Sequence, residues 1–582
     1  MRYVNCRPWL IVAAAMLLPR AGASAPAAPS PNACPAVKLI RHGPVWTLSN
    51  GIVEVAFDTE RVGVREFRFT GAANVLAEDG MYLDCNVPEG YYGFTKHGNP
   101  TMESARVCAR TRQYVDVAVR GRFYDPGAAW ASPLIVDWHV VLQRGDPGFY
   151  SYITAAHQPG AGEMELGQLR AVLRCAERFA DYALTPQRTG RWADHDWKYT
   201  LSRRWEPWSA HGLVDPMTRE SVWAVYGLKH WCRGPDQRDL TLHDGIILTM
   251  FEAGHYGVFP TSRPSSARVR RGWRKLYGPV FYMLTRGGSI RQMYAAASAR
   301  GDEDRRHWPP PWLAEEVGQP ATVRGEVAPS SLQEPVRVVL RNDRYIFWTT
   351  CSPGQAFRIS GVFPGEYDLI ARQGPHASAK ARTVSVTEEG LNVAQVRLAP
   401  SIPRGKLLWE IGTLDDSCEE FAGGPHCWDF EGFKLYAEEF QETHAYTVGE
   451  SRPDRDWYWI HPGPLDDFAG SKVHPWTIRF DLQAVPQRSL LLHIVFADTM
   501  SAAHISPPVY RVELNGRKLA SLQLADGGQA GTYCVADVGV PQHYRIRVPR
   551  QALVAGSNVL VVYPEKNSYV MYDYIALREP GR

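Results

Sequence analysis

The stretch Val53-Glu54-Val55-Ala56-Phe57 places an apolar side chain at every second position. Because successive side chains of a strand point to opposite faces, this alternation predicts a strand with one buried face. The stretch Val115-Asp116-Val117-Ala118-Val119 repeats the pattern. Helix signals are rare from residue 38 onward, and Ser289 to Ala299 is the clearest. So many strands need two stacked sheets to bury their inner faces, and we predict a large antiparallel sandwich.

The proline run Trp308-Pro309-Pro310-Pro311 interrupts regular structure and predicts a linker. Beyond it, short strand patterns continue to the end of the chain, and Asn515-Gly516 is a strong hairpin signal. We therefore predict an all-β fold with three domains. These are a β-sandwich over residues 38–312, a fibronectin type III-like or Ig-like sandwich over 318–400, and a jelly-roll carbohydrate-binding-like domain over 404–582.

The first residues have the pattern of an export signal. A positive end with Arg2 and Arg7 is followed by the apolar run Trp9 to Leu18 and the small residues Ala21-Gly22-Ala23. We predict a signal peptide over residues 1–23 and a linker over 24–37. The apolar run is too short to span a bilayer. We expect the protein to be secreted or periplasmic.

Charge and composition exclude some partners. The 64 Lys and Arg residues nearly balance 61 Asp and Glu residues, giving a net charge of +3. This leaves no strong field for nucleic acid or an anionic membrane, and we expect neither as a partner. The chain is rich in aromatic residues, with 19 Trp and 27 Tyr, which is typical of β-proteins that bind sugars. We expect a monomer.

Ten cysteines stand in the sequence, and loss of the signal peptide removes Cys6. Export permits disulfides, and Cys418 with Cys427 is the favoured pair, with Cys85 and Cys108 the weaker one. The odd number that remains requires at least one unpaired thiol, so buried free thiols stay an equal alternative.

Two nitrogen bases, each beside a tyrosine, are the candidate catalytic groups. Lys198 is followed by Tyr199, and His255 by Tyr256. A lysine acts as a base only if its pKa falls, whereas histidine titrates near neutrality. If these groups converge, they can remove a proton from carbon and protonate a leaving oxygen without a catalytic metal.

Other residues compete for a functional role. Asp194-His195-Asp196 could bind a metal or act as paired carboxylates of a hydrolase. Arg170 could hold a carboxylate with two parallel hydrogen bonds. His211 and His243 could face a cleft. For each of these residues an ordinary surface or core position is the alternative interpretation.

Several motifs occur in the order found in one enzyme family. The first part of the chain carries Asn50 to Val55, Gly167-Gln168-Leu169-Arg170, Lys198-Tyr199, His255-Tyr256-Gly257 and Gly278 to Phe281; the middle and last parts carry Tyr345 to Thr349, Val362 to Tyr367, Leu408 to Gly412, Tyr446 to Gly449, Asp456 to Tyr458 and Met571 to Ile575. With these motifs the chain resembles the rhamnogalacturonan lyases of polysaccharide lyase family 4. It departs from the family pattern at Thr200-Leu201 and at Leu213.

The resemblance implies a mutarotase-like catalytic sandwich, a fibronectin-like unit and a jelly roll. It implies β-elimination on the acidic polysaccharide rhamnogalacturonan I, with Lys198 as base and His255 as acid. It also implies that Arg170 binds substrate. Tyr199, His211 and Tyr256 are further candidates for substrate binding, as residues that could line a sugar cleft. No cofactor or metal is expected for catalysis, and a structural calcium ion in the last domain is left open.

Three other functions remain alternatives. The first is a non-catalytic protein that binds acidic glycans on the same scaffold, and the second is a lyase for a different uronate polysaccharide. The third is a hydrolase that uses carboxylates such as Asp194. A hydrolase makes saturated products, whereas a lyase makes an unsaturated uronate that absorbs ultraviolet light.

Overall fold

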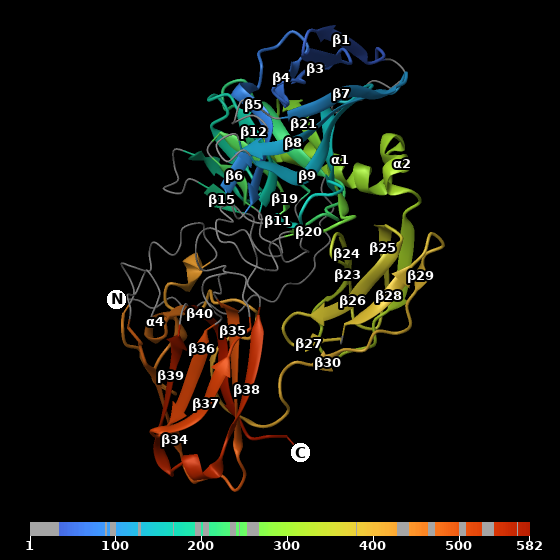
Figure 1. Cartoon of the computed structure of the whole chain (residues 1–582). Helices are drawn as coiled ribbons and strands as arrows, with labels where there is room; N and C mark the ends of the chain where they lie inside the picture. The colour runs from blue at the N-terminus through green and yellow to red at the C-terminus, as the bar shows by residue number, and fades with distance from the viewer. Residues whose placement is uncertain are drawn as a thin grey trace, which may run out of the picture.

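The structure is a computed structural model, and strands dominate it (Figure 1). It describes residues 34–87, 90–93, 101–125, 130–166, 168–192, 199–201, 209–232, 240–243, 245–252, 267–379, 381–427, 441–463, 472–499, 508–525, 541–566 and 569–581. Within these ranges, no helix has both the length and the apolar character needed to cross a membrane. The all-β fold class is confirmed.

Two large antiparallel sheets form the first group of strands. Sheet A runs in the order β1 (Lys38–His42), β2 (Val45–Ser49), β3 (Val53–Asp58), β4 (Gly63–Phe69), β5 (Leu76–Val87), β12 (Gln168–Cys175), β19 (Ile246–Glu252), β18 (Leu240–His243) and β15 (Tyr199–Leu201), with β6 (Gly90–Gly93) beside β5. Sheet B runs in the order β14 (Thr189–Arg191), β13 (Asp181–Ala183), β16 (Ala210–Val214), β17 (Glu220–Tyr226), β21 (Arg274–Arg286), β10 (Gly148–His157), β9 (Trp130–Gln143), β8 (Tyr114–Asp125) and β7 (Thr101–Arg110). The strands β11 (Met164–Leu166) and β20 (Ala267–Val269) form a separate pair.

The alternation seen in the sequence places the core between these sheets. Val115, Val117 and Val119 of β8 are fully buried in one cluster with Val53 and Phe57 of β3. Full burial of each such side chain contributes roughly 1.5–3 kcal/mol. Asp116 and Ala118 therefore face the other side of sheet B. The predicted large sandwich is confirmed.

The middle and last strands form sheets of their own. The middle sheets contain β22 (Ala321–Glu326), β25 (Ala356–Val362) and β29 (Leu391–Asn392), and then β24 (Ile346–Cys351), β23 (Val336–Arg341), β26 (Gly365–Gln373), β27 (Ala377–Ser378), β30 (Ala399–Pro400) and β28 (Arg382–Val386). The last sheets contain β31 (Leu407–Gly412), β40 (Tyr569–Arg578), β35 (Leu490–Thr499), β38 (Gln542–Val548) and β33 (Ile460–Pro462), and then β32 (Ala445–Thr447), β34 (Trp476–Leu482), β39 (Gly556–Lys566), β36 (Val509–Leu514) and β37 (Arg517–Gln523).

Helices are few and short in the described ranges, apart from one. They are α1 (Ile290–Arg306), η3 (Pro311–Leu313), α2 (Ala314–Val317), η4 (Gly424–His426), α4 (Pro453–Asp456) and η5 (Arg550–Ala552). The predicted helix is therefore confirmed, but it ends at Arg306 and not at Ala299. Ser289 caps it, and its side chain accepts a hydrogen bond from the backbone N–H of Gln292.

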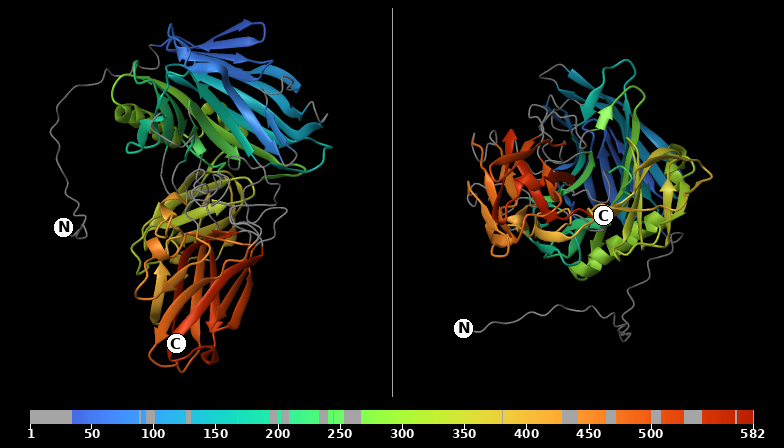
Figure 2. Two further views of the ribbon diagram at one scale, coloured as in Figure 1. Left: turned by 90° about the vertical axis from the view of Figure 1, so that its left-hand side faces the viewer. Right: turned by 90° about the horizontal axis from the view of Figure 1, so that it is seen from below.

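The middle strands pack against the first sandwich. Trp312 of η3 lies with its ring centroid 5.1 Å from that of Tyr150 and 5.5 Å from that of Tyr152, both on β10. The backbone N–H of Leu276 donates to the hydroxyl of Tyr345 at 3.0 Å. One apolar cluster thus joins the outer face of sheet B, α1 and the middle sheets. Figure 2 shows the last group of strands at the far end of the molecule from the sandwich.

The structure tests the two predicted cysteine pairs. Cys85 is buried in the core between the sheets, whereas Cys108 is exposed on β7 of sheet B. The Cys85–Cys108 pair is therefore wrong, because the two thiols lie on different sheets and one faces solvent. Cys418 and Cys427 are both buried and lie close enough to share a hydrogen bond, but they are present as thiols, so the structure does not contain the predicted disulfide.

Candidate functional site

The two predicted catalytic bases lie outside the described residues. These are Lys198 and His255, and Tyr256 and Asp194-His195-Asp196 fall outside them as well. Tyr199 is described through its backbone as the first residue of β15. The candidate site must therefore be approached from the strands that flank it.

The flanking strands meet β19 at different ends. Tyr199 is paired with His243 of β18, which is paired with Ile246 at the start of β19. The last residue of β19 is Glu252, three residues before His255. Tyr199 thus lies two strands away from β19, level with its first residue, whereas the chain leaves toward His255 from the last residue of β19. The convergence of Lys198 with His255 stays a prediction.

Arg170 lies in the middle of sheet A and is held by an acidic partner. Its Nε and Nη2 donate to Oδ2 of Asp84 on β5, at 3.1 and 2.9 Å. The Asp84 side chain is fully buried, and that of Arg170 is 10% exposed. Leu169 and Ala171 point into the core, so Arg170 faces the other side of sheet A. Charge-assisted hydrogen bonds of this kind fix a guanidinium in one orientation.

A second polar pair continues along the same face. Nε of Arg174 donates to the hydroxyl of Tyr82 at 3.1 Å. Burial, followed by the charge of Asp84, raises the pKa of Tyr82, so its hydroxyl stays protonated. The face thus presents two arginines whose positions are set by β5. Sequence reasoning missed Asp84, and its only signal was a polar residue between the apolar Leu83 and Cys85.

The end of β19 is tied to sheet B by a buried charged network. The Glu252 carboxylate accepts hydrogen bonds from Nζ of Lys275 and, at 2.8 Å, from the hydroxyl of Tyr277. Lys275 also donates to the backbone carbonyl of Trp231 at 2.9 Å. These buried partners hold the Glu252 carboxylate in place. The position of Glu252, from which the chain continues toward His255, is therefore fixed.

His211 occupies a core position. It lies on β16 and is fully buried. One ring nitrogen is 3.1 Å from the backbone carbonyl oxygen of Leu248, and the ring stacks on Tyr226 with centroids 5.5 Å apart. The structure therefore does not support direct contact between His211 and a polysaccharide. The packing of this histidine between sheets A and B is its observed role.

Comparisons with known proteins point to one family. Residues 407–577 match the family model described as CBM-like, polysaccharide lyase family 4, domain III. The chain is 25% identical to a rhamnogalacturonate lyase of Dickeya dadantii, over 94% of this chain and 95% of the relative. It is 26% identical to rhamnogalacturonate lyase B of Emericella nidulans, over 75% of this chain and 77% of the relative. These matches confirm the resemblance noted in the sequence.

Among solved structures, a galactose mutarotase-like protein from Lactobacillus casei aligns with part of the chain. The alignment covers 43% of this chain and 100% of that protein, with a TM-score of 0.27 and 8% identity. At this TM-score the alignment supports no conclusion of its own.

Proposed function

We propose that this chain is a polysaccharide lyase that cleaves the rhamnose-(1→4)-galacturonic acid linkage of rhamnogalacturonan I. The observation that carries the proposal is the similarity, over 94% of the chain, to a relative named rhamnogalacturonate lyase. The match of residues 407–577 to a domain of polysaccharide lyase family 4 supports the same assignment.

The proposed reaction is a β-elimination that uses two protein groups. Lys198, as a neutral amine, takes the proton from C5 of the uronate. The electron pair left on C5 forms a double bond to C4, and the bond from C4 to O4 breaks. His255, as an imidazolium, gives its proton to the departing O4. Acid–base assistance of this kind is typically worth roughly 10²–10⁴-fold in rate.

Arg170 has the electrostatic role in this proposal. A C5 proton becomes acidic enough only when the neighbouring carboxylate charge is offset, because charge develops there in the transition state. Asp84 fixes the orientation of the Arg170 guanidinium through two hydrogen bonds. A cation that is already oriented needs no reorganisation when charge develops, which favours catalysis.

We also propose that the protein is exported and acts as a monomer. The support for export is the pattern of a positive end, an apolar run and small residues over 1–23. Sequencing the amino terminus of the mature protein tests export, since a chain that still begins at Met1 would contradict it.

An absorbance assay tests the activity. The purified protein is incubated with rhamnogalacturonan I, with homogalacturonan and without polymer, each with and without a chelator. We expect ultraviolet absorbance to rise with rhamnogalacturonan I alone and to persist with the chelator. Binding of the polymer without any rise in absorbance favours a non-catalytic glycan-binding protein. Saturated products favour a hydrolase, and a rise with another uronate polymer alone favours a different lyase.

Replacement of the proposed base tests the mechanism. We expect Lys198→Ala to reduce the lyase rate by at least about 10²-fold, because no other group would take the C5 proton. Lys38→Ala removes an exposed lysine of β1 and should leave the rate unchanged. Circular dichroism and thermal melting should match the parent chain for both variants. Substantial activity in a folded Lys198→Ala protein would remove Lys198 as the base.

A further inference from the structure

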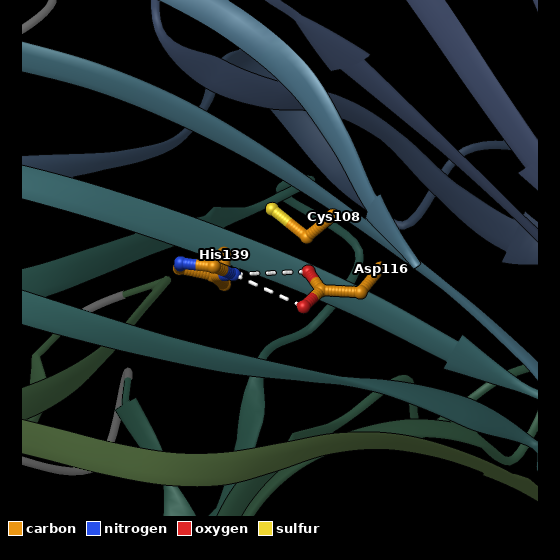
Figure 3. Close-up of side chains that lie close together, drawn as sticks. All are labelled: Cys108, Asp116 and His139. Atoms are coloured by element: carbon orange, nitrogen blue, oxygen red, sulfur yellow. Dashed lines mark hydrogen bonds and ion pairs between the residues drawn. The ribbon is translucent and has the colours of Figure 1, made fainter. Parts of the chain in front are cut away.

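Three residues with metal-binding side chains gather on the outer face of sheet B, away from sheet A. They are Cys108 of β7, Asp116 of β8 and His139 of β9 (Figure 3). One ligand atom from each residue lies within 4.8 Å of the others. Because β7, β8 and β9 are neighbours in the sheet, their pairing brings together residues that are up to 31 positions apart in the sequence.

The strand register explains this convergence. Asp116 is paired with Val141 and Ala118 with His139, so Asp116 and His139 are diagonal neighbours on one face. The pairing of β7 with β8 shifts between Val107 and Ala109, which leaves Cys108 at a bulge. A bulge inserts one residue into a strand and re-aims its side chain, and such features are common beside functional sites.

The buried part of the cluster is already organised. Nδ1 of His139 lies 3.0 and 3.1 Å from the two carboxylate oxygens of Asp116. The hydroxyl of Tyr152 donates to Oδ2 of Asp116 at 3.2 Å, and its ring stacks on the His139 imidazole with centroids 4.2 Å apart. Tyr152 in turn packs against Trp312. Partners that orient ligating carboxylates and imidazoles in this way are typical of protein metal sites.

We propose that Cys108, Asp116 and His139 bind a divalent cation of the zinc class. A thiolate with an imidazole favours borderline-soft ions over calcium or magnesium, which prefer oxygen ligands alone. Open zinc sites have three protein ligands and a water molecule in the fourth position. Cys108 is the exposed member of the cluster, so a water molecule could reach the ion on its side.

The distances fit such an ion. Nδ1 of His139 and Oδ1 of Asp116 are 3.0 Å apart. If each lies about 2.0–2.1 Å from a zinc ion, the angle between them at the metal is about 95°, somewhat below the tetrahedral value. A thiolate at about 2.3 Å from the same ion must lie about 3.5 Å from them. The sulfur of Cys108, which lies within 4.8 Å of the other ligand atoms, therefore has to approach by at most about 1.3 Å, which an exposed residue at a bulge can do.

Titration with cobalt and zinc tests the site in the full chain. After chelation and removal of the chelator, we expect one equivalent of Co²⁺ to produce a thiolate-to-cobalt absorbance band, which Zn²⁺ removes and Ca²⁺ does not. Bound Zn²⁺ should also raise the melting temperature, because it binds the folded chain. A folded parent chain that takes up neither ion overturns the proposal.

Matched variants locate the ion. We expect Cys108→Ser to abolish the band, whereas Cys351→Ser, at a partly exposed cysteine of the middle sheets, should keep it. His139→Gln should weaken Zn²⁺ binding at least about 100-fold, and Tyr152→Phe by about 10-fold, the lower end expected for an outer partner. Circular dichroism verifies that each variant folds. An unchanged band in folded Cys108→Ser would place the ion elsewhere and contradict the proposal.

Discussion

The buried pair of Arg170 and Asp84 shows how one residue sets the chemistry of another. The charge of Arg170 lies inside sheet A and is balanced by a fully buried carboxylate. Removing one partner of such a pair leaves an uncompensated buried charge, which is strongly destabilising. The position of the guanidinium thus depends on a strand, β5, that is 86 residues away in sequence.

We expect Asp84→Asn to lower the free energy of unfolding by about 3 kcal/mol, because Arg170 loses its counter-charge. The variant should also lower the lyase rate more than it changes the apparent affinity for the polymer. Asp79→Asn is the matched control on the same strand, since the Asp79 side chain is 67% exposed and forms its ion pair with Arg174 at the surface. We expect a change below about 0.5 kcal/mol there. Denaturant unfolding and initial rates measure both effects, and equal effects of the two variants would contradict this account.

Individual residues of the site were predicted unevenly. Arg170 was identified from its position after Gly167-Gln168-Leu169, and the structure places it on a strand as expected. Asp84 could not be identified, because a single buried carboxylate has no sequence pattern and its partner comes from a distant strand. His211 was a candidate for a cleft, with a core position as the alternative, and the sequence could not decide between them. A histidine that meets a backbone carbonyl across the core has the same local sequence as one that faces solvent.

At the scale of elements, turn chemistry was the most predictable feature. Asn515 and Gly516 join β36 to β37, with φ of 51° and 75°. Positive φ at both central residues is what this type of hairpin turn requires. Asn515 also donates to the carbonyl of Ala552 and accepts from the backbone N–H of Val559. The same residue therefore forms the turn and fastens it to a neighbouring strand.

Substitutions at Gly516 test the turn. A Cβ there meets no atom within 4 Å, so any cost comes from the backbone conformation alone. We expect Gly516→Ala to lower the free energy of unfolding by about 1 kcal/mol, because residues with a Cβ disfavour this region. Gly516→Asn should cost less, since asparagine tolerates it. Denaturant unfolding of both variants decides, and a larger loss for asparagine would contradict the argument.

The length of α1 was less predictable than its presence. The capping residue Ser289 marks its start, but the charged run after Ala299 has no apolar spacing. The helix continues because Arg300 pairs with Asp146 of the sandwich and with Asp304 one turn later. Gly301 permits close approach, since a Cβ there would lie 2.8 Å from the carbonyl oxygen of Tyr226. Tertiary contacts, which a sequence pattern does not contain, therefore set its end.

At the scale of the whole molecule, His230 lies where the first sandwich meets the middle sheets. Its ring packs among Trp308, Tyr345, Phe347 and Phe363. Burial, followed by the charge of Lys275, lowers the pKa of His230 to about 3. The imidazole is therefore neutral in the folded chain at all but strongly acidic pH. This junction depends on that neutrality, because an imidazolium there would lie among aromatic rings and near the positive charge of Lys275.

Acidic pH should lower the free energy of unfolding through protonation of His230 in the unfolded chain. Between its unfolded pKa of about 6.5 and its folded pKa of about 3, the unfolded chain binds the proton more strongly, so stability falls as pH falls. At about pH 4.5 the loss is about 2–3 kcal/mol. We expect His230→Phe to reduce this pH dependence, and His42→Phe, at an exposed position of β1, to leave it unchanged. Unfolding curves from pH 7.5 to 4.5 test this, and an unchanged slope in His230→Phe would refute it.

The position of β40 has a consequence for how the protein is made. This strand holds the centre of its sheet, between β31 and β35, although it comes last in sequence. A ribosome delivers residues in chain order, so Leu407–Gly412 emerges long before the strand to which it must pair. Until Tyr569–Arg578 has been synthesised, the edges of β31 and β35 remain open for pairing with other chains. A nascent chain that stalls before this strand is therefore the form that chaperones would have to protect from aggregation.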